Sequence, residues 1–222
     1  MRTISIFSLV VILVAILSFS SQAWGQSNPK VLMIPREGYS QNLDLMIKME
    51  IGAMKTLLKE AKLEVDIATS SGVSILGPTE KIEKVMQLSQ IKLDNYVGVI
   101  MPCMAVGMFP GPPVSPEVTA IVKKALLDGK PVAAPIGSAI ILAEAGVLKG
   151  KKYAFARDPL KTTPTQNITD PRFEGGIYSG PGVVQDGKII TSGACPYIER
   201  LYGLQDGTVE LTKKFIAAID SK

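Results

Sequence analysis

The chain contains no histidine and only two cysteines among its 222 residues. Without histidine, the serine–histidine and cysteine–histidine pairs that activate many nucleophiles cannot form, and a common ligand of transition metals is missing. The cysteines, Cys103 and Cys195, are too few for the disulfide framework of a small secreted domain. The glycines around 107–111 lack the spacing of a phosphate-binding loop. We therefore expect no metal site and no cofactor.

A strong charge of one sign is also absent. The chain has 24 basic and 20 acidic residues, a formal net charge of +4. Its lysines are scattered, and no basic stripe with interleaved aromatic residues is present. This pattern predicts a small-molecule ligand as the partner and no nucleic acid.

A long apolar run occurs at the N-terminus. Residues 4–19 carry no charge, follow Arg2, and precede a stretch rich in small residues that ends at Gly25. This layout is typical of a secretory signal peptide, whereas a membrane anchor, the alternative, needs ~20 apolar residues. We expect residues 1–25 to be a signal peptide and 26–222 to form one exported domain, periplasmic in a bacterium, with no membrane contact after cleavage.

The remaining chain alternates apolar runs with helical spacing. The expected strands are 30–35, 63–69, 96–102, 131–135 and 151–156, with a hairpin over 182–193 around Asp186-Gly187. The expected helices are 43–62, 116–130, 138–146 and 206–219. Such alternation predicts a three-layer α/β sandwich with a mostly parallel central sheet, and places ligands at the carboxyl ends of its strands.

Four stretches resemble the ThiJ/PfpI family. They are "LDNYVGVIMP" (93–102), "GKPVAAPIGSAIILAEAGVLKGKKYAF" (129–155), "VVQDGKIITSG" (183–193), and the helix before "LEVDIATSSG" (63–72). The resemblance implies a flavodoxin-like fold related to glutamine amidotransferase domains, and it implies a homodimer.

The family's usual chemistry does not carry over to these residues. The nucleophilic cysteine of the family corresponds to Ile136, and the residue after it, often histidine, corresponds to Gly137. A histidine from a later loop corresponds to Asp158, and the Gly-Gly of the oxyanion site corresponds to Cys103-Met104. An aliphatic side chain forms no thiolate. The resemblance therefore implies a degenerate active site without cysteine hydrolase, glyoxalase or deglycase activity.

The resemblance also implies a glutamate that hydrogen-bonds the catalytic centre. Counting back from "LEVDIA" points to Glu50, whereas counting forward from the first strand points near Asp44, which indicates an insertion between the two. The candidate catalytic residues, should any activity remain, are Cys103, Glu50 and Asp158.

One hypothesis is a noncatalytic protein that binds a small anionic or carbonyl ligand at the remodelled turn between strand 131–135 and helix 138–146. Backbone N–H groups at a helix start favour anions. We expect Ser138 to cap that helix, because a serine without histidine lacks a general base. The candidate ligand-binding residues are Ile136, Gly137, Ser138, Met104 and Arg157.

The other hypothesis is a thiol-dependent enzyme or redox protein that uses Cys103, with Cys195 as its partner. Both cysteines follow strands that end at the same edge, with the strand of Pro135 between them. A disulfide, two inert buried thiols and a reactive pair remain open, since a disulfide needs Cα atoms within ~7 Å.

Overall fold

A seven-stranded sheet forms the middle of the protein, in the order β10-β11-β7-β6-β1-β2-β5. The computed structural model describes residues 28–35, 43–103, 114–162 and 169–221. The strands are β1 (Lys30–Met33), β2 (Glu64–Thr69), β5 (Met86–Gln87), β6 (Tyr96–Ile100), β7 (Val132–Pro135), β10 (Val183–Asp186) and β11 (Ile189–Ser192). All neighbouring strands are parallel except β10 and β11, which form the expected hairpin. The order β2-β1-β6-β7-β11 is the 2-1-3-4-5 arrangement of flavodoxin-like folds, as predicted.

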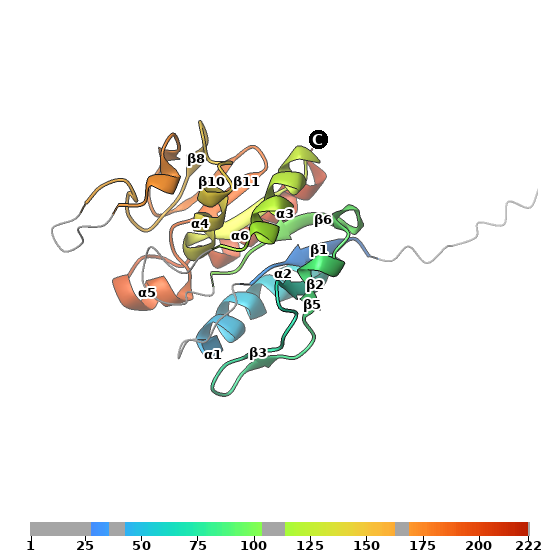
Figure 1. Cartoon of the computed structure of the whole chain (residues 1–222). Helices are drawn as coiled ribbons and strands as arrows, with labels where there is room; N and C mark the ends of the chain where they lie inside the picture. The colour runs from blue at the N-terminus through green and yellow to red at the C-terminus, as the bar shows by residue number, and fades with distance from the viewer. Residues whose placement is uncertain (1–27, 36–42, 104–113, 163–168, 222) are drawn as a thin grey trace, which may run out of the picture.

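Helices cover both faces of the sheet (Figure 1). On one face, α3 (Pro116–Leu127) and α4 (Ile136–Glu144) pack with Leu32 and Ile34 of the first strand region. On the other, α2 (Gly52–Glu60) and α6 (Thr208–Asp220) pack with Val31 and Met33. Alternate residues of β1 thus enter two separate cores, because successive strand residues point to opposite faces. The apolar run at 30–35 reflects burial on both sides.

Three helical segments complete the layers. The chain from α1 (Leu43–Leu45) passes through η1 (Met46–Ile51), a π-helix, into α2. The predicted helix over 43–62 is therefore helical from Leu43 to Glu60 but not a regular α-helix throughout. A short helix, α5 (Pro196–Tyr202), was not predicted.

The region 70–95 is an excursion beside the sheet rather than a layer of it. It contains the hairpin of β3 (Ile75–Leu76) and β4 (Lys81–Ile82), the edge strand β5, and the 3₁₀ turns η2 (Leu88–Gln90) and η3 (Leu93–Asn95). A further 3₁₀ turn, η4 (Pro171–Phe173), lies in the predicted loop 157–176.

The predicted strand at 151–156 is shorter than expected and lies outside the main sheet. Only β8 (Lys152–Tyr153) forms, and it pairs in parallel with β9 (Ile177–Tyr178). Two side chains accept the backbone hydrogen bonds that a neighbouring strand would accept in a sheet. The N–H of Lys152 donates to the Asp186 carboxylate, and the N–H of Ala154 donates to the Thr191 hydroxyl. Loop residues after Ala156 therefore do not extend from a strand of the central sheet.

Within the described ranges, no helix is both long and apolar enough to cross a membrane. The apolar run at residues 4–19, and with it the predicted signal peptide, lies outside these ranges.

We expect Gly98→Ala to destabilise the protein. A Cβ atom at this position in β6 would lie 2.7 Å from the ring of Phe215, which is fully buried, and 3.1 Å from Pro131. Forcing these groups apart costs about 1–3 kcal/mol, measured as a lower urea midpoint. As a control, Gly182→Ala meets nothing within 4 Å and is expected to change the free energy of unfolding by less than about 0.5 kcal/mol. Equal stability of the two variants would contradict this packing.

Candidate functional site

Two cysteines meet at the edge where parallel strands end. Cys103 follows β6, and Cys195 follows β11 and directly precedes α5. The strand between them, β7, was expected from the sequence. Both residues are free thiols with no exposed surface. A hydrogen bond with Cys103 raises the pKa of the Cys195 thiol, and burial raises it further.

The sulfur of Cys103 also contacts the turn between β7 and α4. The backbone N–H of Gly137 donates to Cys103 Sγ at 3.2 Å. Gly137 lies in the first turn of α4, where unpaired N–H groups carry partial positive charge. This bond ties the sulfur of Cys103 to the start of α4. The preceding residue, Ile136, is 7% exposed and packs into the core of that face.

Glu50 is fully buried beside this pair. Its Oε1 accepts a hydrogen bond from the backbone N–H of Cys103 at 2.9 Å, and its Oε2 has no hydrogen-bond partner among the described residues. Burial raises the pKa of the Glu50 carboxyl well above 4.5; Cys195 and Asp206 raise it further, while the N–H of Cys103 opposes them. Burial disfavours the charged form of an acid, so the environment of Glu50 favours its neutral form.

The π-helix explains how Glu50 reaches the cysteines. In η1 the N–H of Gly52 bonds to the carbonyl of Ile47, five residues earlier. A π-turn widens a helix and is found mostly at functional sites. This irregularity is consistent with the insertion indicated by counting residues. Asp44, the other candidate, instead accepts hydrogen bonds from the backbone of Thr79 and Glu80.

The first backbone N–H groups of α5 interact with Cys195, the residue directly before this helix. Backbone N–H groups of Tyr197 and Ile198 lower the pKa of Cys195, but the hydrogen bond from Cys103 and burial outweigh them. The sequence carried signals for this helix, since Pro196 occupies its first turn and Gly203 ends it in the left-handed conformation, at φ 66°. Asp206, which lies near Glu50, was also not anticipated.

Ser138 does not cap α4, contrary to the prediction. The helix begins at Ile136, two residues earlier than expected, so Ser138 lies inside its first turn. Its buried hydroxyl donates to the carbonyl of Pro102 at 2.8 Å. This bond ties α4 to the segment that carries Cys103, and it makes Ser138 a structural contact of the site.

The remaining predicted site residues make other contacts. Asp158 accepts from the N–H of Leu160 and forms an ion pair with Lys161, so it stabilises its own turn. The guanidinium of Arg157 lies 5.1 Å from the ring centre of Tyr202, at the end of α5. Met104 lies outside the described residues.

The fold and this edge define a class: an α/β sandwich whose candidate thiol site lies at the carboxyl ends of parallel strands. The chain belongs to the DJ-1/PfpI family, whose model matches residues 41–202. An uncharacterised protein of Methanocaldococcus jannaschii is 29% identical over 181 residues, which cover 80% of each chain.

Solved structures share the fold. Drosophila melanogaster DJ-1beta superposes with a TM-score of 0.60 at 22% identity, over 88% of this chain and 92% of that one. A ThiJ/PfpI domain protein from Brachyspira murdochii has a TM-score of 0.60 at 13% identity, over 88% of this chain and 98% of that one. These likenesses concern the fold alone.

We expect Glu50→Gln to remove a pH dependence of stability. The native protein holds the Glu50 proton above pH 4.5, whereas the unfolded chain releases it there. Stability of the wild-type protein should therefore fall as pH rises above this value, by at most about 1.4 kcal/mol per pH unit from this group. Glutamine keeps an acceptor for the Cys103 N–H but does not titrate.

Urea unfolding between about pH 4.5 and 7.5 measures the difference between the two proteins. Glu64→Gln removes an exposed carboxyl and serves as the control. Its free energy of unfolding should change with pH as that of the wild-type protein does. Parallel curves for wild type and Glu50→Gln would show that Glu50 is ionised in the native protein.

Proposed function

We propose that this member of the DJ-1/PfpI family is a thiol redox protein in which Cys103 and Cys195 alternate between dithiol and disulfide. The observation that carries the proposal is the closeness of two buried free thiols, seen in the raised pKa of Cys195 beside Cys103. Cysteines that lie close together need only small shifts to bond, whereas distant cysteines need backbone movement. The proposed oxidant is a small hydroperoxide, because both sulfurs are buried.

The proposed reaction has two steps. First, the Cys103 thiolate attacks the terminal oxygen of the hydroperoxide, the O–O bond breaks, and the leaving oxygen takes a proton. Cys103 is then a sulfenic acid. Second, the Cys195 sulfur attacks the Cys103 sulfur, its thiol proton leaves with the displaced hydroxide as water, and the disulfide forms. Two thiols and one hydroperoxide thus give one disulfide, one water and one alcohol, or a second water when the oxidant is hydrogen peroxide.

The contacts assign different parts to the two cysteines. Cys103 Sγ accepts the N–H of Gly137, which ties this sulfur to the start of α4. The raised pKa of Cys195 keeps that residue a thiol, so we assign the attack to Cys103 and the second step to Cys195. Glu50 has a raised pKa and an oxygen without a partner among the described residues, which supports the role of proton donor to the leaving oxygen.

The contacts of the turn between β7 and α4 support the ligand-binding hypothesis less well than the redox hypothesis. Gly137, the expected donor to an anion, already donates its N–H to Cys103, and Ser138 is buried with its hydroxyl bonded to Pro102. In this proposal Ile136 stands where the family has its nucleophile, so the family's cysteine chemistry at that position is not expected. Export, which the N-terminal apolar run suggests, would favour the disulfide form.

Treatment of the purified protein with one equivalent of hydrogen peroxide should remove both thiols together. We expect a mass lower by two hydrogen atoms and a single peptide pair linking Cys103 to Cys195, both reversed by dithiothreitol. In Cys195→Ser, Cys103 should stop at a sulfenic acid that dimedone traps. In Cys103→Ser, oxidation of Cys195 should be at least about tenfold slower, because burial still raises the pKa of Cys195 after Cys103 is removed.

Two outcomes would contradict the proposal. The thiols could stay unmodified in the native protein yet react in urea, which would make them inert core residues. Equal peroxide rates in the two single variants would remove the distinction between an attacking and a resolving cysteine.

A further inference from the structure

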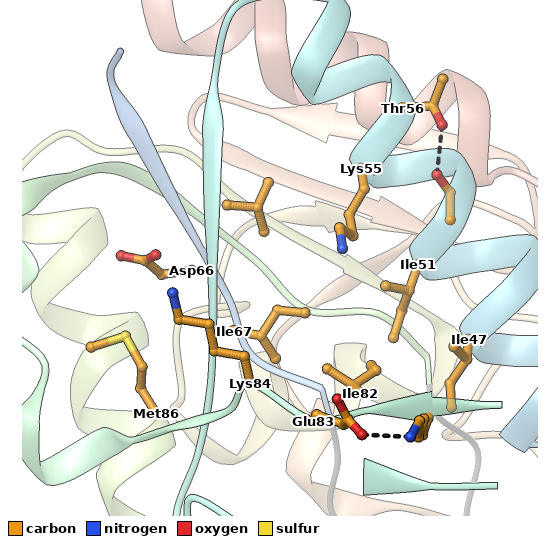
Figure 2. Close-up of a pocket in the computed structure, with 13 residues that line it drawn as sticks. Ile47, Ile51, Lys55, Thr56, Asp66, Ile67, Ile82, Glu83, Lys84 and Met86 are labelled. Carbon is orange, nitrogen blue, oxygen red and sulfur yellow. Dashed lines mark hydrogen bonds and ion pairs between the residues drawn. The ribbon is translucent and has the colours of Figure 1, made fainter. Parts of the chain in front are cut away.

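A cavity lies beside β2, at the side of the sheet formed by β2 and β5. This cavity, of about 650 Å³, is enclosed by η1 and α2 on one side, by β2 on another, and by the segment from Lys81 to Met86. Figure 2 shows the side chains of these three walls facing a common space. Its volume lies within the range of ~300–1,000 Å³ usual for small-molecule sites.

The cavity exists because the sheet edge opens. The edge strand β5 pairs with β2 only at Ala68 and Thr69, and the chain before it diverges. Glu64 donates its N–H to Pro29, on the β1 side. Since alternate residues of a strand direct their backbone groups to opposite sides, the N–H groups of Val65 and Ile67 point to the open edge. The described residues supply no backbone partner for them.

About half of the cavity wall is apolar. Ile47 and Ile51 project from η1, Ile67 from β2, and Ile82 and Met86 from the opposite segment. Such a wall favours a ligand with an apolar body, because removing apolar surface from water stabilises a complex.

The rim of the cavity carries uncompensated positive charge. Lys55 on α2 and Lys84 on the opposite segment both line it, and neither has a paired carboxylate in the part of the chain that is described. Each of the two acidic side chains of the lining has a lysine partner of its own: Asp66 pairs with Lys30 at 3.1 Å, and Glu83 pairs with Lys81, which also lines the cavity, at 2.5 Å. Figure 2 places the two lysines on different walls.

We propose that this cavity binds a small amphipathic organic anion of the medium-chain carboxylate class. Its apolar chain lies against the isoleucines, and its carboxylate lies at the ammonium group of Lys55, with Lys84 adding positive charge to the lining. The open edge of β2 offers a further N–H donor to the same carboxylate. This site does not depend on the redox chemistry proposed for Cys103.

Decanoate, below its micelle concentration, is the probe, with decan-1-ol as the neutral control and decyltrimethylammonium as the cationic one. Isothermal titration calorimetry should give a saturable one-to-one complex with decanoate alone, weaker at high salt. Lys55→Glu combined with Lys84→Glu should weaken it at least about fivefold. Lys59→Glu, on the same helix but outside the lining, should lower the affinity by less than twofold.

A substitution that fills the cavity tests whether decanoate binds there. Gly52 lines the cavity, adopts helical dihedrals, and would place a Cβ atom no closer than 3.6 Å to its neighbour, the carbonyl of Ile47. Gly52→Leu should therefore fold and abolish decanoate binding, while Gly52→Ala should retain it. Unchanged binding in Gly52→Leu would overturn the assigned place, and equal binding of decan-1-ol would overturn the assigned charge. A failure of either kind leaves the cysteine reaction unaffected.

Discussion

The hydrogen bond from the Cys103 N–H to buried Glu50 is the interaction on which the site depends. It joins the π-helix η1 to the end of β6, two elements that belong to different layers. A carboxyl taken out of water without a partner is costly, and this bond satisfies only one of its oxygens. Burial accordingly raises the pKa of the Glu50 carboxyl well above 4.5, which favours its neutral form. This edge of the sheet therefore combines a buried acid with two buried thiols.

The π-helix then connects two regions that otherwise share no residue. Glu50 points from η1 toward the cysteines, whereas Ile47 and Ile51 of the same six residues line the cavity at the sheet edge. A regular α-helix repeats every 3.6 residues, and the wider turn changes which side chains face each side. The same local irregularity therefore shapes both the thiol site and one wall of the cavity.

The fold could be predicted because its signals are local. Apolar runs buried on both faces gave β1, β6 and β7, and Asp186-Gly187 gave the hairpin turn, where Gly187 has a φ of 61°. Ser115 and Pro116 begin α3 as helix-start residues do. Such features depend on a few neighbouring residues, so a single sequence is enough to recognise them.

The site was harder to predict because its contacts join distant residues. Nothing local shows that the segments after β6 and β11 bring Cys103 and Cys195 together, or that Ser138 bonds to Pro102 rather than capping its helix. The choice between Glu50 and Asp44 stayed open for a related reason, since counting residues assumes a regular helix. A seven-residue helix such as α5 is too short for its periodicity to be visible.

The start of α4 donates the backbone N–H of Gly137 to a sulfur, although Ile136 in the same turn has no nucleophilic side chain. That sulfur belongs to Cys103, which follows the neighbouring strand β6, and Glu50 of η1 accepts the backbone N–H of the same residue. The groups around the thiol and the thiol itself therefore lie on different segments: η1 and α4 supply the former, and the residue after β6 supplies the latter.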